Sequence, residues 1–360
     1  MNRIMCVLAV VTSFSLSPEV PAQEQTPNHP ARYQLIQAVD ETFFDKVNDR
    51  ASQGYRLGAL TAAPTSLVGI MEHMEEPSPH FNYLPVLVRA VKHKHGTIWK
   101  VREEITDRLN EAGEKGYRLH MTVRDMAVME SSSDSKQHYQ YAVTLPGGFM
   151  SFKKDDLPGL LAAGYHWAGA AITFAILERI EGPDKPHENS EPTSNTNPDR
   201  RLTFAENNFA INELPEKQLY KLASGGARVV DAFGTLRVSV VAMEETIPPS
   251  APYEYVVLKP RNEALPLVER VKMSKVEAAD VNRAAQQGFR LLSLTAPVPP
   301  FVMEKAPGST RHYEYQFITA SKLPELADQL NGSGMSRFHI AKLTTTEEGF
   351  LVVMEKSDAP

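Results

Sequence analysis

A four-residue phrase recurs along this chain and limits its possible folds more than any other feature. The phrase is a glycine followed by an aromatic, a basic and a hydrophobic residue, with single positions varying between copies. The six copies are Gly54-Tyr55-Arg56-Leu57, Gly116-Tyr117-Arg118-Leu119, Gly164-Tyr165-His166-Trp167, Gly226-Ala227-Arg228-Val229, Gly288-Phe289-Arg290-Leu291 and Arg337-Phe338-His339-Ile340. A Met-Glu or Leu-Glu pair follows each copy, and an aromatic alternation such as Tyr253-Glu254-Tyr255 precedes it. Such self-similarity indicates repeated supersecondary units.

The spacing of the copies shows a second level of repetition. The phrases begin at positions 54, 116, 164, 226, 288 and 337, so the intervals are 62, 48, 62, 62 and 49 residues. Copies one and four, two and five, and three and six are therefore 172, 172 and 173 residues apart. Because long and short intervals return in the same order, the sequence predicts a three-repeat block that occurs twice.

Each copy is predicted to form a strand, a helix and two further strands. The aromatic alternation has the period of a half-buried strand. In the second copy, Val101, Ile105, Leu109 and Ala112 share one face of a helix. Gly116 then follows where a helix needs a left-handed residue to stop.

The sixth copy departs from this rule, because Arg337 replaces the glycine. Two explanations stay open. Arg337 adopts the left-handed conformation at a cost of about 1 kcal/mol, or Gly332 and Gly334 move the helix end earlier.

We predict an α+β fold built from six β-α-β-β repeats, arranged as a duplicated three-repeat block. A repeat of roughly 50 residues cannot bury both faces of its sheet alone, so we expect the three repeats of a block to share one core. Whether the strands join into one sheet or form three small ones stays open. The expected domains are residues 27–181 and 201–357.

A segment between the blocks, residues 182–200, is predicted to be a linker. It contains four prolines together with Asn, Ser, Thr and charged residues, and no aliphatic residue. A segment of this composition cannot bury apolar surface. We therefore expect the two blocks to fold independently.

The first 22 residues have the layout of a signal peptide. Arg3 precedes an apolar run from Ile4 to Leu16, and Val20-Pro21-Ala22 offers small side chains for cleavage before Gln23. A helix over this run spans about 20 Å, less than the roughly 30 Å of a bilayer core, which makes a membrane anchor the weaker interpretation. A buried N-terminal helix is the other alternative.

Composition narrows the location and the class of partner. The only cysteine, Cys6, leaves with the predicted signal peptide, so we expect a secreted or periplasmic bacterial protein without disulfides. The formal net charge is −6, which argues against a nucleic-acid-binding protein. We expect a protein or an envelope component as partner, and no transmembrane segment after signal removal.

The repeat resembles a family of short uncharacterised bacterial domains of unknown function. The closest match is Leu109-Asn110-Glu111-Ala112-Gly113-Glu114-Lys115-Gly116-Tyr117-Arg118-Leu119, and Tyr253-Glu254-Tyr255-Val256-Val257 matches the opening of the family pattern. The chain has Tyr, Phe or Ala where the family has Trp. The resemblance implies a β-α-β-β fold and no known activity.

The repeated charged side chains have two interpretations. The glutamates of the Met-Glu and Leu-Glu pairs either face solvent beside a buried neighbour or form a ring that binds a cation or a basic ligand. They are Glu72, Glu130, Glu178, Glu244, Glu304 and Glu355. The repeated arginines are either solvent-facing strand residues or a basic stripe. They are Arg56, Arg118, Arg228 and Arg290.

Other candidates for chemistry are few. His93 and His95 are weak metal-ligand candidates, and a solvated basic loop is the favoured interpretation of this stretch. A serine nucleophile elbow, a zinc-binding His-Glu-x-x-His and a phosphate-binding glycine loop are absent from the sequence. No cofactor is predicted.

The sequence therefore favours a non-catalytic exported repeat protein that supplies a binding or scaffolding surface. Catalysis needs several different groups in one place, and here the copies that depart from the repeat lose features instead of adding reactive ones. The alternative is a hydrolase or metal-dependent enzyme with a site between the two repeat blocks.

Overall fold

The computed structural model describes most of the chain after residue 30. The described residues are 31–75, 79–89, 98–144, 156–171, 174–181, 199–208, 216–234, 238–247, 249–258, 274–292, 301–332, 335, 337–346 and 349–358. The predicted signal peptide, residues 1–22, lies outside these ranges. So does the predicted linker, residues 182–200, except Asp199 and Arg200.

The elements of the described residues follow one order in each of six units. Unit 1 comprises β1 (Tyr33–Ala38), α1 (Asp40–Ala51), β2 (Tyr55–Ala63) and β3 (Ser66–His73). Unit 2 comprises β4 (Phe81–Leu87), α2 (Ile98–Glu114), β5 (Arg118–Val123) and β6 (Met126–Ser132). Unit 3 comprises β7 (His138–Thr144), α3 (Asp156–Ala162), β8 (His166–Ala171) and β9 (Phe174–Glu181).

The second half repeats this order. Unit 4 comprises β10 (Asp199–Asn208), α4 (Glu216–Ser224), β11 (Arg228–Gly234) and β12 (Val238–Ile247). Unit 5 comprises β13 (Glu254–Leu258), α5 (Ser274–Gln286), β14 (Arg290–Leu291) and β15 (Phe301–Lys305). Unit 6 comprises β16 (Tyr313–Ala320), α6 (Leu323–Leu330), β17 (His339–Thr346) and β18 (Gly349–Ser357).

The prediction of an α+β fold is wrong. Of the described residues, 52% lie in strands and 26% in helices, and the strands form six small three-stranded antiparallel sheets. In each sheet the last strand of the unit lies between the other two, as in the order β1-β3-β2. The helices, from 7 residues in α3 to 17 in α2, contain half as many residues as the strands, so strands dominate the described chain.

The expectation of one shared core per block does not describe the packing either. The buried apolar residues of the described chain form six clusters, and each joins neighbouring units. One cluster, for example, unites Leu109 and Met129 of unit 2 with Tyr141 and Ile176 of unit 3. The reason is geometric, because a three-stranded sheet has two faces and each unit brings only one helix, so a neighbouring unit covers what the helix leaves open.

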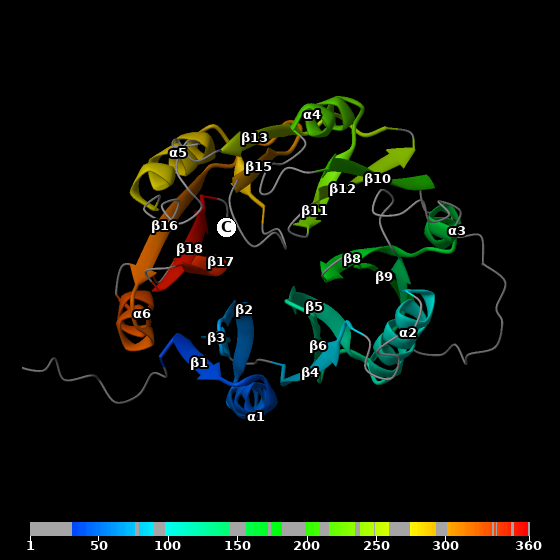
Figure 1. Cartoon of the computed structure of the whole chain (residues 1–360). Coiled ribbons are helices and arrows are strands. Elements are labelled where there is room, and N and C mark those ends of the chain that lie inside the picture. Colours follow the sequence, from blue (N-terminus) through cyan, green and yellow to red (C-terminus); the bar gives the residue numbers. More distant parts are fainter. Residues whose placement is uncertain are drawn as a thin grey trace, which may run out of the picture. The chain divides into compact units, whose positions relative to one another are not determined.

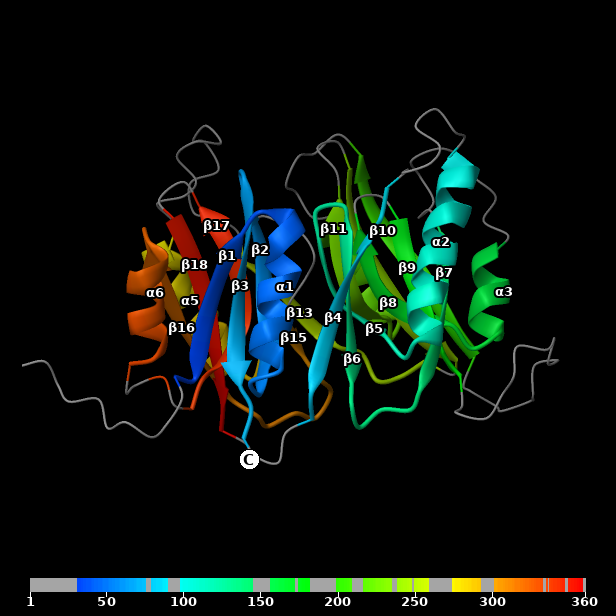
Figure 2. The same ribbon diagram turned by 90° about the horizontal axis from the view of Figure 1, so that it is seen from below.

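The units form a closed cycle within the compact part of the chain, residues 31–360. Tyr33, Val68 and Ile70 of unit 1 pack against Ile318 and Met354 of unit 6 in one core cluster. The strands β2, β5, β8, β11 and β17 lie innermost and the helices outermost (Figure 1). Figure 2 shows α1 and α2 running beside the strands that they cover.

Glycines end the helices as the sequence predicts. The five phrase glycines have positive φ angles, for example +83° at Gly116 and +92° at Gly288, which a residue without Cβ adopts without strain. In the sixth unit α6 ends at Leu330 with Asn331 as its C-cap, so the helix stops well before Arg337. This agrees with the second explanation, an earlier helix end.

Candidate functional site

The boundary between units 2 and 3, here called junction 2/3, carries a compact polar cluster. Arg118 opens β5 two residues after the helix-stopping Gly116, and its Nε donates to Glu178 Oε1 of β9 at 2.9 Å. Tyr141 of β7 donates its hydroxyl to Glu178 Oε2 at 3.0 Å and accepts from the Leu119 backbone N–H at 2.8 Å. Glu178 is only 1% exposed, so a buried carboxylate fastens the two units together.

Strand register alone does not decide which glutamate the arginine binds. Arg118 lies opposite Glu130 in its own sheet, yet its guanidinium turns to the glutamate of the next unit. It also stacks over the ring of Tyr139 at 5.9 Å from the centroid. The stack and the charge pair together hold the side chain in one orientation.

The same cluster recurs at three more junctions of the described chain. At junction 1/2 the arginine pairs with both carboxylate oxygens of Glu130, through Nη2 at 2.8 Å and Nε at 3.0 Å. In each case a tyrosine hydroxyl donates to the same glutamate. The triads are Arg56, Tyr83 and Glu130 at junction 1/2, Arg228, Tyr255 and Glu304 at junction 4/5, and Arg290, Tyr315 and Glu355 at junction 5/6.

The surroundings lower the pKa of two of these carboxylates and raise the pKa of the four tyrosines. Burial acts to raise the pKa of Glu178, but the hydrogen bond from His166, the charge of Arg118 and the hydroxyl of Tyr141 outweigh it, so the pKa is lowered. The pKa of Glu130 is lowered in the same way, with the hydrogen bond from Arg56 foremost against burial. Burial and the adjacent carboxylate raise the pKa of Tyr83, Tyr141, Tyr255 and Tyr315.

Junctions 3/4 and 6/1 are built differently. Their second strands carry His166 and His339 in place of the arginine, and the arginine comes from the following unit, either in its first strand or directly before it. Arg200 pairs with Glu244 at 2.9 Å, and both belong to unit 4. Arg32, directly before β1, pairs with Glu72 at 2.9 Å, and both belong to unit 1.

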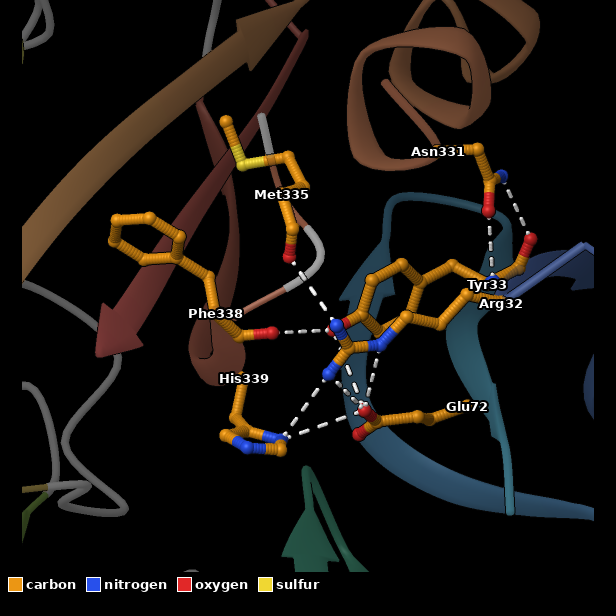
Figure 3. A network of polar contacts seen from close by, with 7 residues as sticks. All are labelled: Arg32, Tyr33, Glu72, Asn331, Met335, Phe338 and His339. Atoms are coloured by element: carbon orange, nitrogen blue, oxygen red, sulfur yellow. Dashed lines mark hydrogen bonds and ion pairs between the residues drawn. The ribbon is translucent and has the colours of Figure 1, made fainter. Parts of the chain in front are cut away.

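Figure 3 shows junction 6/1 in detail. His339 Nδ1 lies 3.4 Å from Glu72 Oε1, and Arg32 Nη1 donates to the Met335 carbonyl at 3.2 Å. Tyr33 donates its hydroxyl to the Phe338 carbonyl at 2.8 Å. Unit 6 is thereby tied to unit 1 by polar contacts as well as by the shared core.

Asparagines near the helix ends form a second kind of contact between units. Asn331 accepts from the Tyr33 backbone N–H and donates to the Tyr33 carbonyl, both at 2.9 Å. The first strand of each unit lies at a sheet edge, and this amide satisfies its free backbone groups as a neighbouring strand would. Asn48 and Asn282 contact the first strands of units 2 and 6 in the same way, and Asn110 accepts from the Tyr141 backbone N–H of unit 3.

The six predicted glutamates therefore occupy one equivalent position on the third strand of each unit, opposite the junction tyrosine or, in unit 4, opposite Leu202. Each has an arginine partner, including the four arginines singled out from the sequence. His93 and His95 lie outside the described residues. Within the described ranges, no three His, Cys, Asp or Glu side chains are grouped closely enough to hold a metal ion.

Two further findings complete the description. No helix in the described part of the chain has both the length and the hydropathy that crossing a bilayer requires. Searches against protein-family models, curated proteins and solved structures found no match to this chain.

Sequence reasoning missed three kinds of contributor. The tyrosine hydroxyls were read only as part of an alternating strand, and Arg32 and Arg200 stand outside the repeated phrases. Asn331 was detectable, because Leu330-Asn331 precedes Arg337 by the same spacing with which Val47-Asn48 precedes Gly54. Aligning the sixth copy on that asparagine would have identified it.

Proposed function

We propose that this chain is a non-catalytic exported protein whose cycle of repeats presents a binding or scaffolding surface. One observation carries the proposal. The repeated carboxylates, arginines and tyrosine hydroxyls form hydrogen bonds and ion pairs with one another at the junctions, so these groups hold neighbouring units together. A group already neutralised and hydrogen-bonded in this way is poorly suited to proton transfer or nucleophilic attack.

The outer side of these clusters is the surface that we propose for binding. The guanidinium groups of Arg56, Arg118 and Arg228 stack over Phe81, Tyr139 and Tyr253 at 5.1, 5.9 and 5.2 Å. The arginine side chains remain 41%, 55% and 54% exposed, while the side chains of their partner glutamates are 12%, 1% and 7% exposed. Aromatic residues and arginine are enriched at protein interfaces, which supports a protein partner.

The test is cross-linking of the purified full chain in a bacterial envelope extract, followed by mass spectrometry of the products. Phe81→Ser and Tyr253→Ser remove the aromatic platforms and keep the buried glutamates paired. Loss of one specific product in both variants, and its retention in Lys115→Ala on α2, would support the proposal. A product that persists unchanged in both platform variants would contradict this choice of surface.

The alternative is a hydrolase or metal-dependent enzyme with its site between the two repeat blocks. A panel of ester, phosphoester, glycoside and peptide substrates, each with and without added Zn²⁺ or Mg²⁺, distinguishes the two. We expect no turnover above that of buffer. Turnover that one side-chain substitution abolishes, in a protein that stays folded, would favour the enzyme.

A further inference from the structure

Junctions 3/4 and 6/1 form a matched pair that divides the cycle into equal halves. His166 and His339 are equivalent residues of the duplicated block, and Arg200 and Arg32 supply the guanidinium at the two junctions. The halves, residues 31–181 and 199–358, therefore begin and end with the same kinds of surface.

When the halves separate at junctions 3/4 and 6/1, neither glutamate loses its arginine partner. Arg200–Glu244 and Arg32–Glu72 each lie within one unit, so both ion pairs survive when the halves part. Opening any of the other four junctions would remove the arginine from a glutamate whose side chain is at most 13% exposed, and Glu178 and Glu304 are the most buried at 1% and 7%. An uncompensated buried charge is among the most unfavourable consequences of separating two surfaces.

Separating the two halves would expose the apolar cores of junctions 3/4 and 6/1, and these cores must then be covered by another surface. The core at junction 3/4 has only Ala170, Val240 and Ala242 as buried members among the described residues. The core at junction 6/1 is larger and includes Tyr33, Ile318 and Met354. Exposure of this larger core is unfavourable, and a second copy of the chain offers the same two faces in the same order.

We propose that the partner of these faces is a second copy of this chain. In the resulting dimer, residues 31–181 of each copy close a cycle with residues 199–358 of the other. The contacts at all junctions are those of the monomer, and only the crossing between Glu181 and Asp199 connects different halves. Such exchange of identical elements is a low-cost route to a dimer. The inference is independent of the proposed function.

Single cysteines on different chains test the exchange. In a Cys6→Ser background, Thr345→Cys and Ala62→Cys mark junction 6/1, where the Thr345 hydroxyl donates to the Ala62 carbonyl at 3.2 Å. The two full-length variants are mixed, held at high concentration slightly below the melting midpoint, cooled and treated with a short bismaleimide. A matched control mixes Glu114→Cys with His138→Cys, because both side chains are exposed and His138 Nδ1 lies 2.8 Å from the Glu114 carbonyl oxygen within one half.

We expect light scattering to detect a dimer whose fraction rises with protein concentration. The first mixture should give an interchain cross-linked product, and the control mixture should give none. The two results that would overturn the proposal are a chain that stays monomeric throughout and a dimer whose two mixtures cross-link equally. Equal cross-linking would mean that the dimer arises from another surface.

Discussion

Arg118 and Glu178 belong to neighbouring units, and their side chains meet at 2.9 Å with the carboxylate almost fully buried. The arginine side chain is 55% exposed, so one partner remains hydrated while the other is not. This asymmetry lowers the desolvation cost on the cation side. It also means that the carboxylate depends on its neighbours for every favourable interaction.

Replacing this arginine measures that dependence. We expect Arg118→Gln to lower the free energy of unfolding by about 3 kcal/mol, because Glu178 stays buried without its main positive partner. Lys115→Gln is the control, since Lys115 and Glu111 form an exposed i,i+4 pair whose loss should change the free energy of unfolding far less. Urea unfolding measures both variants, and equal effects would show that Tyr141 and His166 suffice for Glu178 without Arg118.

Acid should weaken the same junction. The pKa of Glu178 is lower in the folded protein than the ordinary value, so the unfolded state binds more protons as the pH falls. Its contribution to stability is therefore complete above about pH 4.3, the ordinary glutamate pKa, and is lost as the pH falls toward the folded value. Unfolding between pH 3 and pH 7 should show a steeper acid decline in the unmodified chain than in Glu178→Gln.

The control for this profile is Glu111→Gln, which removes an exposed carboxylate of α2. Its acid decline should match that of the unmodified chain. An unchanged slope in Glu178→Gln would assign the acid sensitivity to other groups. Comparing slopes separates the titration from any constant loss of stability that the glutamine causes.

Local features of the fold were predictable because they depend on neighbouring residues. Gly116 has the positive φ that the phrase predicts, and Leu109 and Ala112 are buried on one helix face. Contacts between units were not predictable in this way. Register places Arg56 opposite Glu72, but its hydrogen bonds go to Glu130, because the approach of the next sheet decides the partner.

The prediction of the fold class was wrong for a related reason. The periodicity of apolar residues predicts the strands and helix of one unit. It does not show which neighbouring unit covers each sheet face, and this decides how the cores are shared. The duplicated spacing suggested two separate blocks, each with its own core. The structure instead places the larger core of junction 6/1 between the two blocks, joining Tyr33 to Ile318.

A glycine inside α2 tests the fit between a helix and the following unit. A Cβ on Gly113 would lie 2.0 Å from the Tyr139 carbonyl oxygen, so the helix or β7 must shift. We expect Gly113→Ala to destabilise the protein by about 3 kcal/mol, in spite of the better helix propensity of alanine. Gly159→Ala in α3 meets no atom within 4 Å, and should stabilise by about 0.5 to 1 kcal/mol. Opposite signs in thermal unfolding are the expected result, and a stabilising Gly113→Ala would contradict the close approach of α2 and β7.

Cutting the chain between the halves tests the closure of the cycle. A protease site introduced within residues 182–198 yields two fragments, which we expect to stay together in size-exclusion chromatography through junctions 3/4 and 6/1. Asn331→Ala removes both hydrogen bonds to the Tyr33 backbone, so the cut protein should dissociate at lower urea concentration than the cut parent.

Asn110→Ala is the matched change inside one half, where Asn110 accepts from the Tyr141 backbone N–H at 2.6 Å. It should lower the stability of that half without promoting dissociation, because junction 2/3 does not separate the fragments. Fragments that part as soon as the chain is cut would mean that the cycle is held closed by its covalent connection and not by junction 6/1.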